Sequence, residues 1–417
     1  MTPDERPLSV IESPLREQHE AESVRDPVEI AALNEADRPG AATGQPEGRL
    51  ELEYLPWGAG EGSEDSPSCW ILATCGWVEL EYAAMRRGCG LLDQPNRATI
   101  SLRGEDRTDL VDRMVTQDLG GLESTRACRS FLTDRKGRLI SDLLILSLPD
   151  EILLDVDVHQ RHVVCEVLKD HVFTEDVSIE DATERWYRIG LHGPETATVL
   201  DGFGSFPGSE LEVSMLDLVN STMPVVRRDL AATSGCDLFV PRDKVVDAWQ
   251  ALQKQAGIRA VRARTVGWYA FNTARVEGGT PLFNIDFGTT NLPHETGLID
   301  TCVSFTKGCY PGQEVVARMQ HLGQPKQQLR GLRIMSDGLP VAGTQVFATE
   351  DAELAEPTGV VTSSTISPLA GATPLAFAML NKRVVAEGTI VRLHAEGEVC
   401  QARVGGLDVL GSSESAS

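Results

Sequence analysis

The stretch SFTKGCYPGQEVVARMQHLG, Ser304 to Gly323, places a cysteine between two glycine-containing turns, directly ahead of a helical pattern. Gln313 to Leu322 are helix formers with apolar side chains on one face, and Gly323 follows as a C-cap. The preceding TCVSFT predicts a strand. Cys309 should therefore lie on a strand-to-helix turn, where the helix dipole and Lys307 would favour its thiolate form. Such a thiol is either reactive or a small side chain that packs within the turn.

The charge of the chain is strongly acidic and unevenly distributed. The formal net charge is −24 over 417 residues, which argues against non-specific binding to nucleic acid, and no direct nucleic-acid contact is expected. Residues 1–66 alone hold sixteen Asp and Glu against five Lys and Arg, and they nearly lack aromatic side chains. Such a segment cannot bury enough apolar surface to offset its ordering entropy. We therefore expect residues 1–68 to form a disordered acidic region.

The cysteines and the hydropathy pattern bear on the cellular compartment. The nine cysteines are scattered, odd in number and never spaced as Cys-x-x-Cys, which is unlike a secreted disulfide framework and predicts no metal site. No charged-then-apolar signal opens the sequence, and no apolar run reaches the length of a membrane span. We expect a cytoplasmic, monomeric protein without a membrane segment.

The pattern along the chain predicts an α+β domain followed by a β-barrel. Amphipathic helices are predicted in WVELEYAAMRRGCGLLD, EDRTDLVDRMVTQDL and HQRHVVCEVLKDHV, and strands in ATISLRG and EILLDVD. SFLTDRKGRLISDLLILSL predicts a hairpin with its turn at Asp134 to Gly137. Short strand-like runs separated by Gly, Pro and Ser then predict a small barrel. The expected domains are 69–325, with two related βαβ-type halves, and the barrel over 326–411, followed by a disordered tail over 412–417.

The motif KGCYPGQEVVAR, Lys307 to Arg318, resembles the signature of the YgfZ-type folate-binding proteins. These belong to the superfamily of GcvT, the T protein or aminomethyltransferase of the glycine cleavage system. Weaker landmarks of the superfamily are GLLDQPNRATISLRGED, TQDL, ARVEGGTPLF and TGVVTSSTISP. The resemblance spans roughly Trp77 to Leu410. It implies a GcvT/YgfZ-like folate-binding domain that is followed by a small C-terminal β-barrel.

The resemblance also implies that tetrahydrofolate, or a folate derivative, binds in a central channel. Asp142 matches the aspartate that lies beside the reacting folate nitrogen in aminomethyltransferases, whereas Ser141 stands where these enzymes often have a second aspartate. Asp237 falls where they carry a glutamate that pairs with the pterin. Phe271 falls where they carry an arginine that meets the folate.

The chemistry of a folate calls for groups that this sequence contains. The donor-rich edge of the pterin needs a buried acceptor, for which the two aspartates are candidates, and the glutamate tail needs cations. The candidate cations are Arg275, Lys307 and Arg318. Arg275 also belongs, with Glu277, to the Arg-x-Glu-x-Gly landmark of the family. Arg318 could equally pair with Glu314 at i, i+4 spacing on the signature helix.

Three classes of function compete at this point. The YgfZ-type signature implies a tetrahydrofolate-binding accessory protein for iron–sulfur cluster assembly or repair, with indirect effects on tRNA modification. In such an accessory protein, Cys309 would be a reactive thiol or a transient cluster ligand. Its partners would be iron–sulfur assembly or client proteins. The alternative is a tetrahydrofolate-dependent aminomethyltransferase with Asp142 as the catalytic group, which Phe271 and the cysteine signature oppose. The third class is a non-catalytic interaction scaffold.

Overall fold

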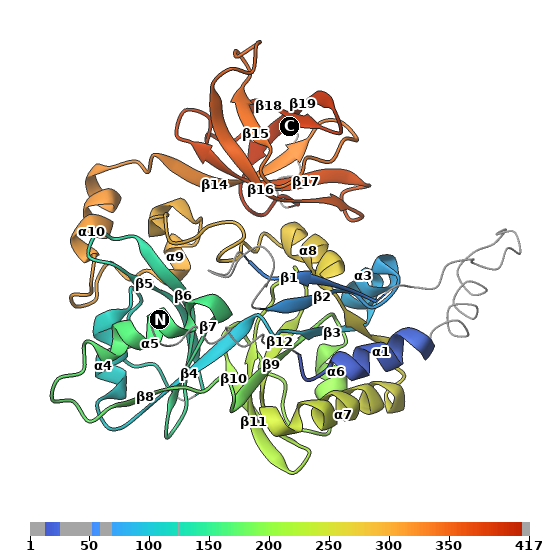
Figure 1. Ribbon diagram of the computed structural model, residues 1–417, viewed down its shortest axis with the longest axis vertical. Coiled ribbons are helices and arrows are strands. Elements are labelled where there is room, and N and C mark those ends of the chain that lie inside the picture. Colours follow the sequence, from blue (N-terminus) through green and yellow to red (C-terminus); the bar gives the residue numbers. More distant parts are fainter. Residues whose placement is uncertain (1–12, 26–51, 59–68, 124, 411–417) are drawn as a thin grey trace, which may run out of the picture.

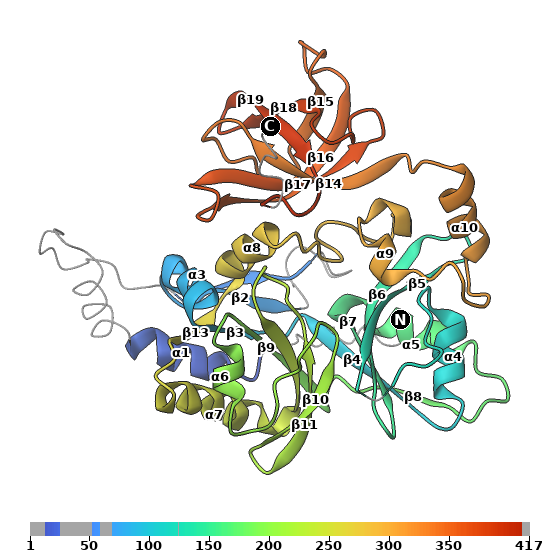
Figure 2. The ribbon, with the colours of Figure 1, turned by 180° about the vertical axis from the view of Figure 1, so that it is seen from behind.

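The computed structural model describes residues 13–25, 52–58, 69–123 and 125–410 of the 417-residue chain. This part contains two large sheets that lie side by side and a closed barrel at one end of the molecule (Figures 1 and 2). The fold class predicted from the sequence, a mixed α and β domain followed by a small barrel, is confirmed.

The five-stranded sheet carries Asp142. Its strands pair antiparallel in the order β5-β6-β7-β4-β8. The strands and their helices are β4 (Arg97–Arg103), α4 (Arg107–Met114), β5 (Ala127–Thr133), β6 (Leu139–Ser147), β7 (Ile152–Asp157), η1 (Val158–Gln160), α5 (Arg161–Lys169) and β8 (Ser178–Asp181). The apolar stripes of α4 and α5, which recur at helical spacing, are buried against this sheet in one core cluster.

The six-stranded sheet has the order β10-β11-β12-β9-β3-β13, in which β13 pairs parallel with β3 and the other pairs are antiparallel. Its strands are β3 (Cys89–Asp93), β9 (Trp186–His192), β10 (Val213–Leu218), β11 (Ser221–Arg227), β12 (Gly235–Pro241) and β13 (Ala263–Val266). Its helices are α3 (Val78–Arg87), α6 (Thr196–Leu200), η2 (Arg242–Lys244), α7 (Val245–Ile258) and α8 (Trp268–Glu277). Trp249 and Leu252 of α7 are fully buried against this sheet.

The β5–β6 hairpin forms where the turn residues predict it. Asp134 accepts hydrogen bonds at Oδ1 from the backbone amides of Lys136 (2.8 Å) and Arg138 (2.9 Å), and Gly137 adopts a φ of +73°. This turn fixes the register in which Phe131 of β5 opposes Asp142 of β6. The hairpin therefore determines which face of the sheet carries the carboxylate.

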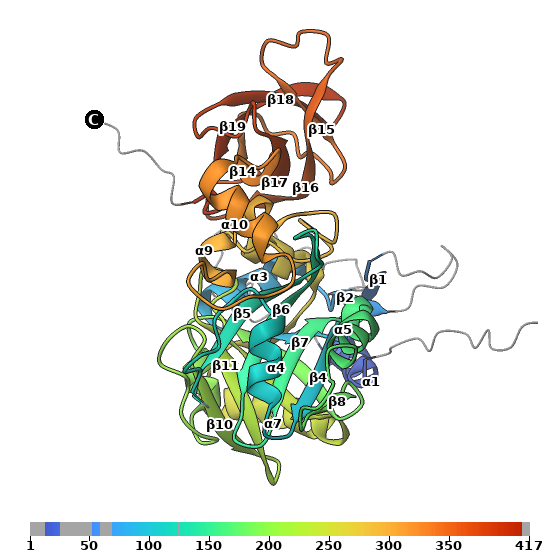
Figure 3. The same cartoon turned by 90° about the vertical axis from the view of Figure 1, so that its left-hand side faces the viewer.

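The barrel closes in the order β14-β17-β16-β15-β18-β19. Its strands are β14 (Gln327–Ile334), β15 (Gln345–Ala348), β16 (Pro357–Ser367), β17 (Thr373–Asn381), β18 (Ile390–Ala395) and β19 (Glu398–Gly405). Alternate residues of β18 and β19 are buried, as expected for strands with one face toward the barrel interior. Figure 3 shows the barrel above α10 and the sheets.

The prediction of disorder over residues 1–68 is wrong for two short segments. Residues Arg16–Arg25 form α1, and Glu53–Pro56 form β1, which pairs antiparallel with β2 (Trp70–Thr74). His19 of α1 is fully buried, and Glu22 accepts hydrogen bonds from Trp249 Nε1 and Gln253 Nε2 of α7. The acidic side chain of Glu22 thus finds partners on the fold, which an average over the composition cannot reveal. The remaining part of that prediction, and the tail over 412–417, lie outside the described residues.

The chain around the signature motif departs from the predicted strand. TCVSFT contains the end of a short helix, α9 (Ile299–Cys302), which follows η3 (Pro293–Glu295) and leads into a loop. The helix α10 (Gln313–Leu322) begins where the sequence predicts it. Gly312 precedes it with a φ of +83°, and a Cβ there would lie 2.4 Å from the backbone oxygen of Asp134. No helix in the described ranges has the length and apolarity needed to cross a membrane.

Candidate functional site

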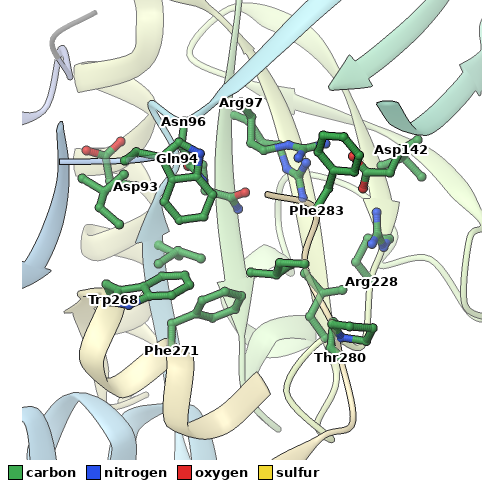
Figure 4. Close-up of a pocket in the computed structure, with 18 of the residues that line it drawn as sticks. Asp93, Gln94, Asn96, Arg97, Asp142, Arg228, Trp268, Phe271, Thr280 and Phe283 are labelled. Carbon is green, nitrogen blue, oxygen red and sulfur yellow. The ribbon is translucent and has the colours of Figure 1, made fainter. Parts of the chain in front are cut away.

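A cavity lies where the two large sheets meet, beside the helix α8 that carries Trp268 and Phe271 (Figure 4). Its apolar wall contains Trp57, Leu92, Leu230, Trp268, Phe271 and Phe283. Its polar lining contains Asp93, Gln94, Asn96, Arg97, Arg129, Asp142, Arg188 and Arg228. The cavity thus combines flat aromatic surfaces with a few polar groups, as a site for a flat, partly polar ligand requires.

Asp142 is the one residue of the predicted catalytic and cofactor-binding set that lines this cavity. Its Oδ1 atom is buried and has no hydrogen-bond partner among the described residues. Its neighbour Ser141 is fully buried and turns its hydroxyl to the backbone oxygen of Asp142 at 2.8 Å. An acceptor left unsatisfied inside a protein costs about 1–3 kcal/mol, so such a group is typically reserved for a ligand or water.

Asp237 is close to the cavity but not on its wall. The carboxylate is fully buried, accepts a hydrogen bond from Gln94 Nε2 at 3.0 Å and pairs with Arg188. Burial alone would raise the pKa of this carboxyl, but Arg188, Arg228 and His192 together hold the pKa below its usual value. The structure therefore gives Asp237 a supporting position behind Gln94 and Arg188, in place of the direct contact with a pterin that the resemblance implies.

Arg97 and Arg188 reach the cavity from β4 and β9 with their guanidinium groups already paired. Arg97 donates to Asp155 at 2.7 and 3.1 Å, and Arg188 donates to both Asp155 and Asp237. Both carboxylates are fully buried. These charges balance one another inside the protein and leave little capacity for a ligand.

Arg129 and Arg228 line the same cavity without hydrogen bonds from their guanidinium groups to any described residue. Arg228 is only 7 % exposed, and its Nε atom is buried and unpartnered. Burial, and next the charge of Arg129, lower the pKa of Arg228 to about 10, so the group remains a cation at neutral pH. Sequence reasoning missed both residues, although Arg129 stands two positions from Phe131, on the strand face shared with Asp142.

Cys309 is not on the cavity wall. It is exposed on the loop before α10, whereas the eight other cysteines, all among the described residues, are buried or half-buried. The ammonium group of Lys307 is not directed at the sulfur of Cys309. Its Nζ atom donates instead to the backbone oxygens of Asp112, Val115 (3.0 Å) and Gln117 (2.8 Å). Lys307 thus binds the carboxyl end of α4, where a cation is favourable.

Arg275 and Glu277 are structural links between α8 and the barrel. Arg275 is fully buried and donates to Asp286 at 2.7 Å and to Ser363 of β16 at 2.6 Å. Glu277 is also fully buried and accepts hydrogen bonds from Tyr82 at 2.7 Å and from the amide of Leu369 at 3.2 Å. Neither residue lines the cavity, so the proposed contacts with a folate are not supported for them.

Arg318 lies on α10 with its side chain exposed and outside the cavity. Of the three cations predicted for a folate tail, then, none is placed at the cavity. The part of the signature motif that leads into α10 instead packs against the β5–β6 hairpin. There the hydroxyl of Thr133 donates to the backbone oxygen of Pro311 at 2.5 Å.

Comparisons with known proteins define the family. The family model described as the GCVT N-terminal domain matches residues 72–307, more than half of the chain. The chain therefore belongs to the GCVT family. The narrower resemblance to YgfZ-type proteins stays a prediction.

Individual relatives agree with this assignment. The chain is 23 % identical over 310 residues to an aminomethyltransferase of Staphylococcus carnosus, which covers 73 % of this chain and 82 % of that protein. It is 26 % identical over 349 residues to an aminomethyltransferase of Streptomyces coelicolor, covering 80 % and 86 %. The crystal structure of the glycine cleavage system aminomethyltransferase T from Bartonella henselae is similar in fold, with a TM-score of 0.72 and 19 % identity over 82 % of this chain and 92 % of that one.

Aminomethyltransferases of this family use tetrahydrofolate, and the lining of the cavity fits such a group. The aromatic side chains of Trp268 and Phe271 can pack on a flat ring system. The unpartnered Oδ1 of Asp142 can accept from a ring N–H. The guanidinium groups of Arg129 and Arg228, which donate no hydrogen bond to a described residue, can meet a carboxylate. The residues that would hold a folate are thus present, although most differ from those predicted.

Proposed function

We propose that this protein binds tetrahydrofolate in the cavity between its sheets and transfers a one-carbon unit to it, as an aminomethyltransferase of the glycine cleavage type. The observation that carries the proposal is the Asp142 carboxylate, which lines the cavity with a buried oxygen that no described residue satisfies. Membership of the GCVT family supports the same reaction class.

The roles of the side chains follow from their positions. When bound, tetrahydrofolate supplies the ring nitrogen that receives the one-carbon unit. Asp142 would hold the proton of that nitrogen at its Oδ1 atom and orient the ring. Trp57 and Trp268, whose rings meet edge to face at 5.3 Å, exclude water from one side of the cavity. Arg97 and Arg188, paired with Asp155, keep the polar wall rigid.

The proposal is tested by titrating the full-length protein with tetrahydrofolate in a calorimeter and then assaying ammonia release from an aminomethylated, lipoylated carrier protein. We expect saturable binding at one site and ammonia release that depends on tetrahydrofolate. If tetrahydrofolate binds but no ammonia is released, the transferase activity is excluded and only the binding of tetrahydrofolate is supported. Absence of both would leave the interaction scaffold as the better description.

A second candidate, an accessory role in iron–sulfur cluster assembly or repair, is favoured by the exposure of Cys309. Its thiol is accessible on a surface loop, beside the half-buried Lys307. A partner could therefore reach this sulfur without entering the cavity. The role depends on protein contact at that loop, independent of the chemistry at Asp142.

For this role we expect that a Cys309→Ser variant restores iron–sulfur enzyme activities at least tenfold less well than the native chain in cells that lack the protein, because serine cannot replace a thiolate as a soft ligand. Activities of cluster enzymes in cell extracts measure the effect. The buried Cys400, replaced by serine, is the matched control for expression. If the native and Cys309→Ser chains restore the activities of iron–sulfur enzymes equally well, the accessory role of Cys309 is contradicted.

A further inference from the structure

The end of the cavity that holds Asp142 also holds two cations without counter-charges at hydrogen-bonding distance. Arg129 and Arg228 reach it from β5 and from the residue after β11, and neither guanidinium donates a hydrogen bond to a described residue. Figure 4 shows Arg228 and Asp142 at the same end of the cavity, opposite Trp268 and Phe271. This arrangement contrasts with Arg97 and Arg188, whose guanidinium groups are bound by buried aspartates.

The nearest acidic group does not neutralise this pair fully. Glu210 approaches Arg228 Nε at 3.8 Å, beyond hydrogen-bonding distance, and its side chain is 48 % exposed. Glu210 already accepts a hydrogen bond from the amide of Asp229 at 2.8 Å. Asp229 in turn is bound by Arg227. The buried Asp237 also acts on Arg228 by its charge, but it accepts no hydrogen bond from Arg228. The N–H groups of Arg228 therefore stay without bonded acceptors among the described residues, and an anionic ligand could supply these acceptors.

The register of the β5–β6 hairpin fixes the separation between Arg129 and Asp142. Phe131 opposes Asp142, and Arg129 opposes Leu144, so Arg129 and Asp142 are diagonal neighbours on one face of the sheet. Diagonal neighbours in an antiparallel sheet are separated by roughly 7–8 Å. A ligand that places a nitrogen against Asp142 could therefore present an anionic group to the arginines, provided that its nitrogen and its anion lie about this far apart or farther, within the reach of the long arginine side chains.

We propose that Arg129 and Arg228 form a carboxylate-binding site at the Asp142 end of the cavity. The inference rests on the proposed function, because it assigns a second recognition element to the same site. Guanidinium groups bind carboxylates in a bidentate, planar geometry, which sets the carboxylate apart from a simple point charge. The carboxylate belongs either to the glutamate tail of the folate or to a small amino acid that binds beside the pterin.

The test compares two reduced pterins on the full-length protein. Tetrahydrofolate carries the glutamate carboxylates, whereas 6-methyltetrahydropterin has the same ring system and no carboxylate. Each is titrated calorimetrically into the wild type, Arg129→Gln and Arg228→Gln, and glycine is titrated into the complex with 6-methyltetrahydropterin. The control is Arg383→Gln, which removes an exposed arginine of the barrel. Arg129→Lys keeps the charge without the planar fork.

If the folate tail is the ligand, Arg129→Gln weakens tetrahydrofolate binding by about 10- to 100-fold and leaves 6-methyltetrahydropterin binding unchanged. If an amino acid is the ligand, both pterins bind the variant normally and glycine binding is lost by a similar factor. Arg129→Lys should recover only part of either loss. Because Arg129 is half-buried, its variants are expected to fold even if Arg228→Gln does not.

Two results would be unfavourable in distinguishable ways. If the wild type binds tetrahydrofolate but both glutamine variants bind every ligand as the Arg383→Gln control does, the carboxylate site is wrong and the proposed function stands. If the wild type binds neither reduced pterin, the proposed function fails and the carboxylate site with it.

Discussion

Asp142→Asn is expected to slow tetrahydrofolate-dependent ammonia release by about 100- to 10,000-fold, the usual contribution of a positioned acid or base. Asparagine keeps an oxygen that can accept a hydrogen bond from a ring N–H, but it cannot hold a proton. Affinity for tetrahydrofolate should accordingly change by less than about tenfold, the value of one ordinary hydrogen bond. Steady-state rates of ammonia release and calorimetric titration measure the two quantities separately.

Asp150→Asn is the matched control, because this aspartate is exposed just after the strand that carries Asp142. It should leave both the rate and the affinity unchanged. A parallel loss of folate affinity and rate in Asp142→Asn would instead assign this carboxylate to binding alone. An unchanged rate would contradict its role as the catalytic group.

Local pattern was sufficient for the elements that place Asp142. The turn residues of the β5–β6 hairpin and the alternation of β6 fix its face and register, and these are properties of neighbouring residues. The resemblance to the GcvT superfamily is what singles out Asp142 among the residues of this strand. The same local pattern could not place Cys309, since the direction in which a loop faces depends on contacts made by residues far away in the sequence. Lys307, for example, is bound by backbone oxygens nearly 200 positions earlier.

The polar lining of the cavity was the least predictable part. Arg129, Arg188 and Arg228 come from different strands, and whether each is paired is decided by aspartates on yet other strands. No spacing in the sequence reports such pairing. Trp57 lies in a segment whose composition predicts disorder, yet it donates to Asp157 at 2.8 Å and lines the cavity. A single large aromatic residue can thus anchor an otherwise polar segment.

Arg188→Met is expected to lower the free energy of unfolding by about 3–5 kcal/mol, because it leaves buried carboxylates without their cation. Arg188 bridges Asp155 and Asp237, both fully buried, and methionine fills similar volume without charge. Arg97 remains on Asp155, so the unpaired charge falls mainly on Asp237. Urea unfolding followed by circular dichroism gives the free energy, and an unchanged m-value would show that the folded state remains compact.

The pairing of Arg188 with Asp237 can be separated from simple packing by two further measurements. Arg185→Met is the control, since Arg185 pairs with Glu151 near the surface and its loss should cost about 1 kcal/mol or less.

The pH dependence of stability is the first of these measurements. In the wild type, the pKa of Asp237 is lowered, so the stabilising effect of this carboxylate is lost only as pH falls through that pKa. Without Arg188, only Arg228 and His192 still oppose the effect of burial, so the pKa of folded Asp237 should rise. Folded Asp237 would then take up a proton at higher pH, and the stability deficit should narrow as pH falls toward about 4. An Arg188→Met/Asp237→Asn double variant should likewise recover part of the loss. A deficit independent of pH, with no recovery in the double variant, would assign the effect of Arg188 to packing.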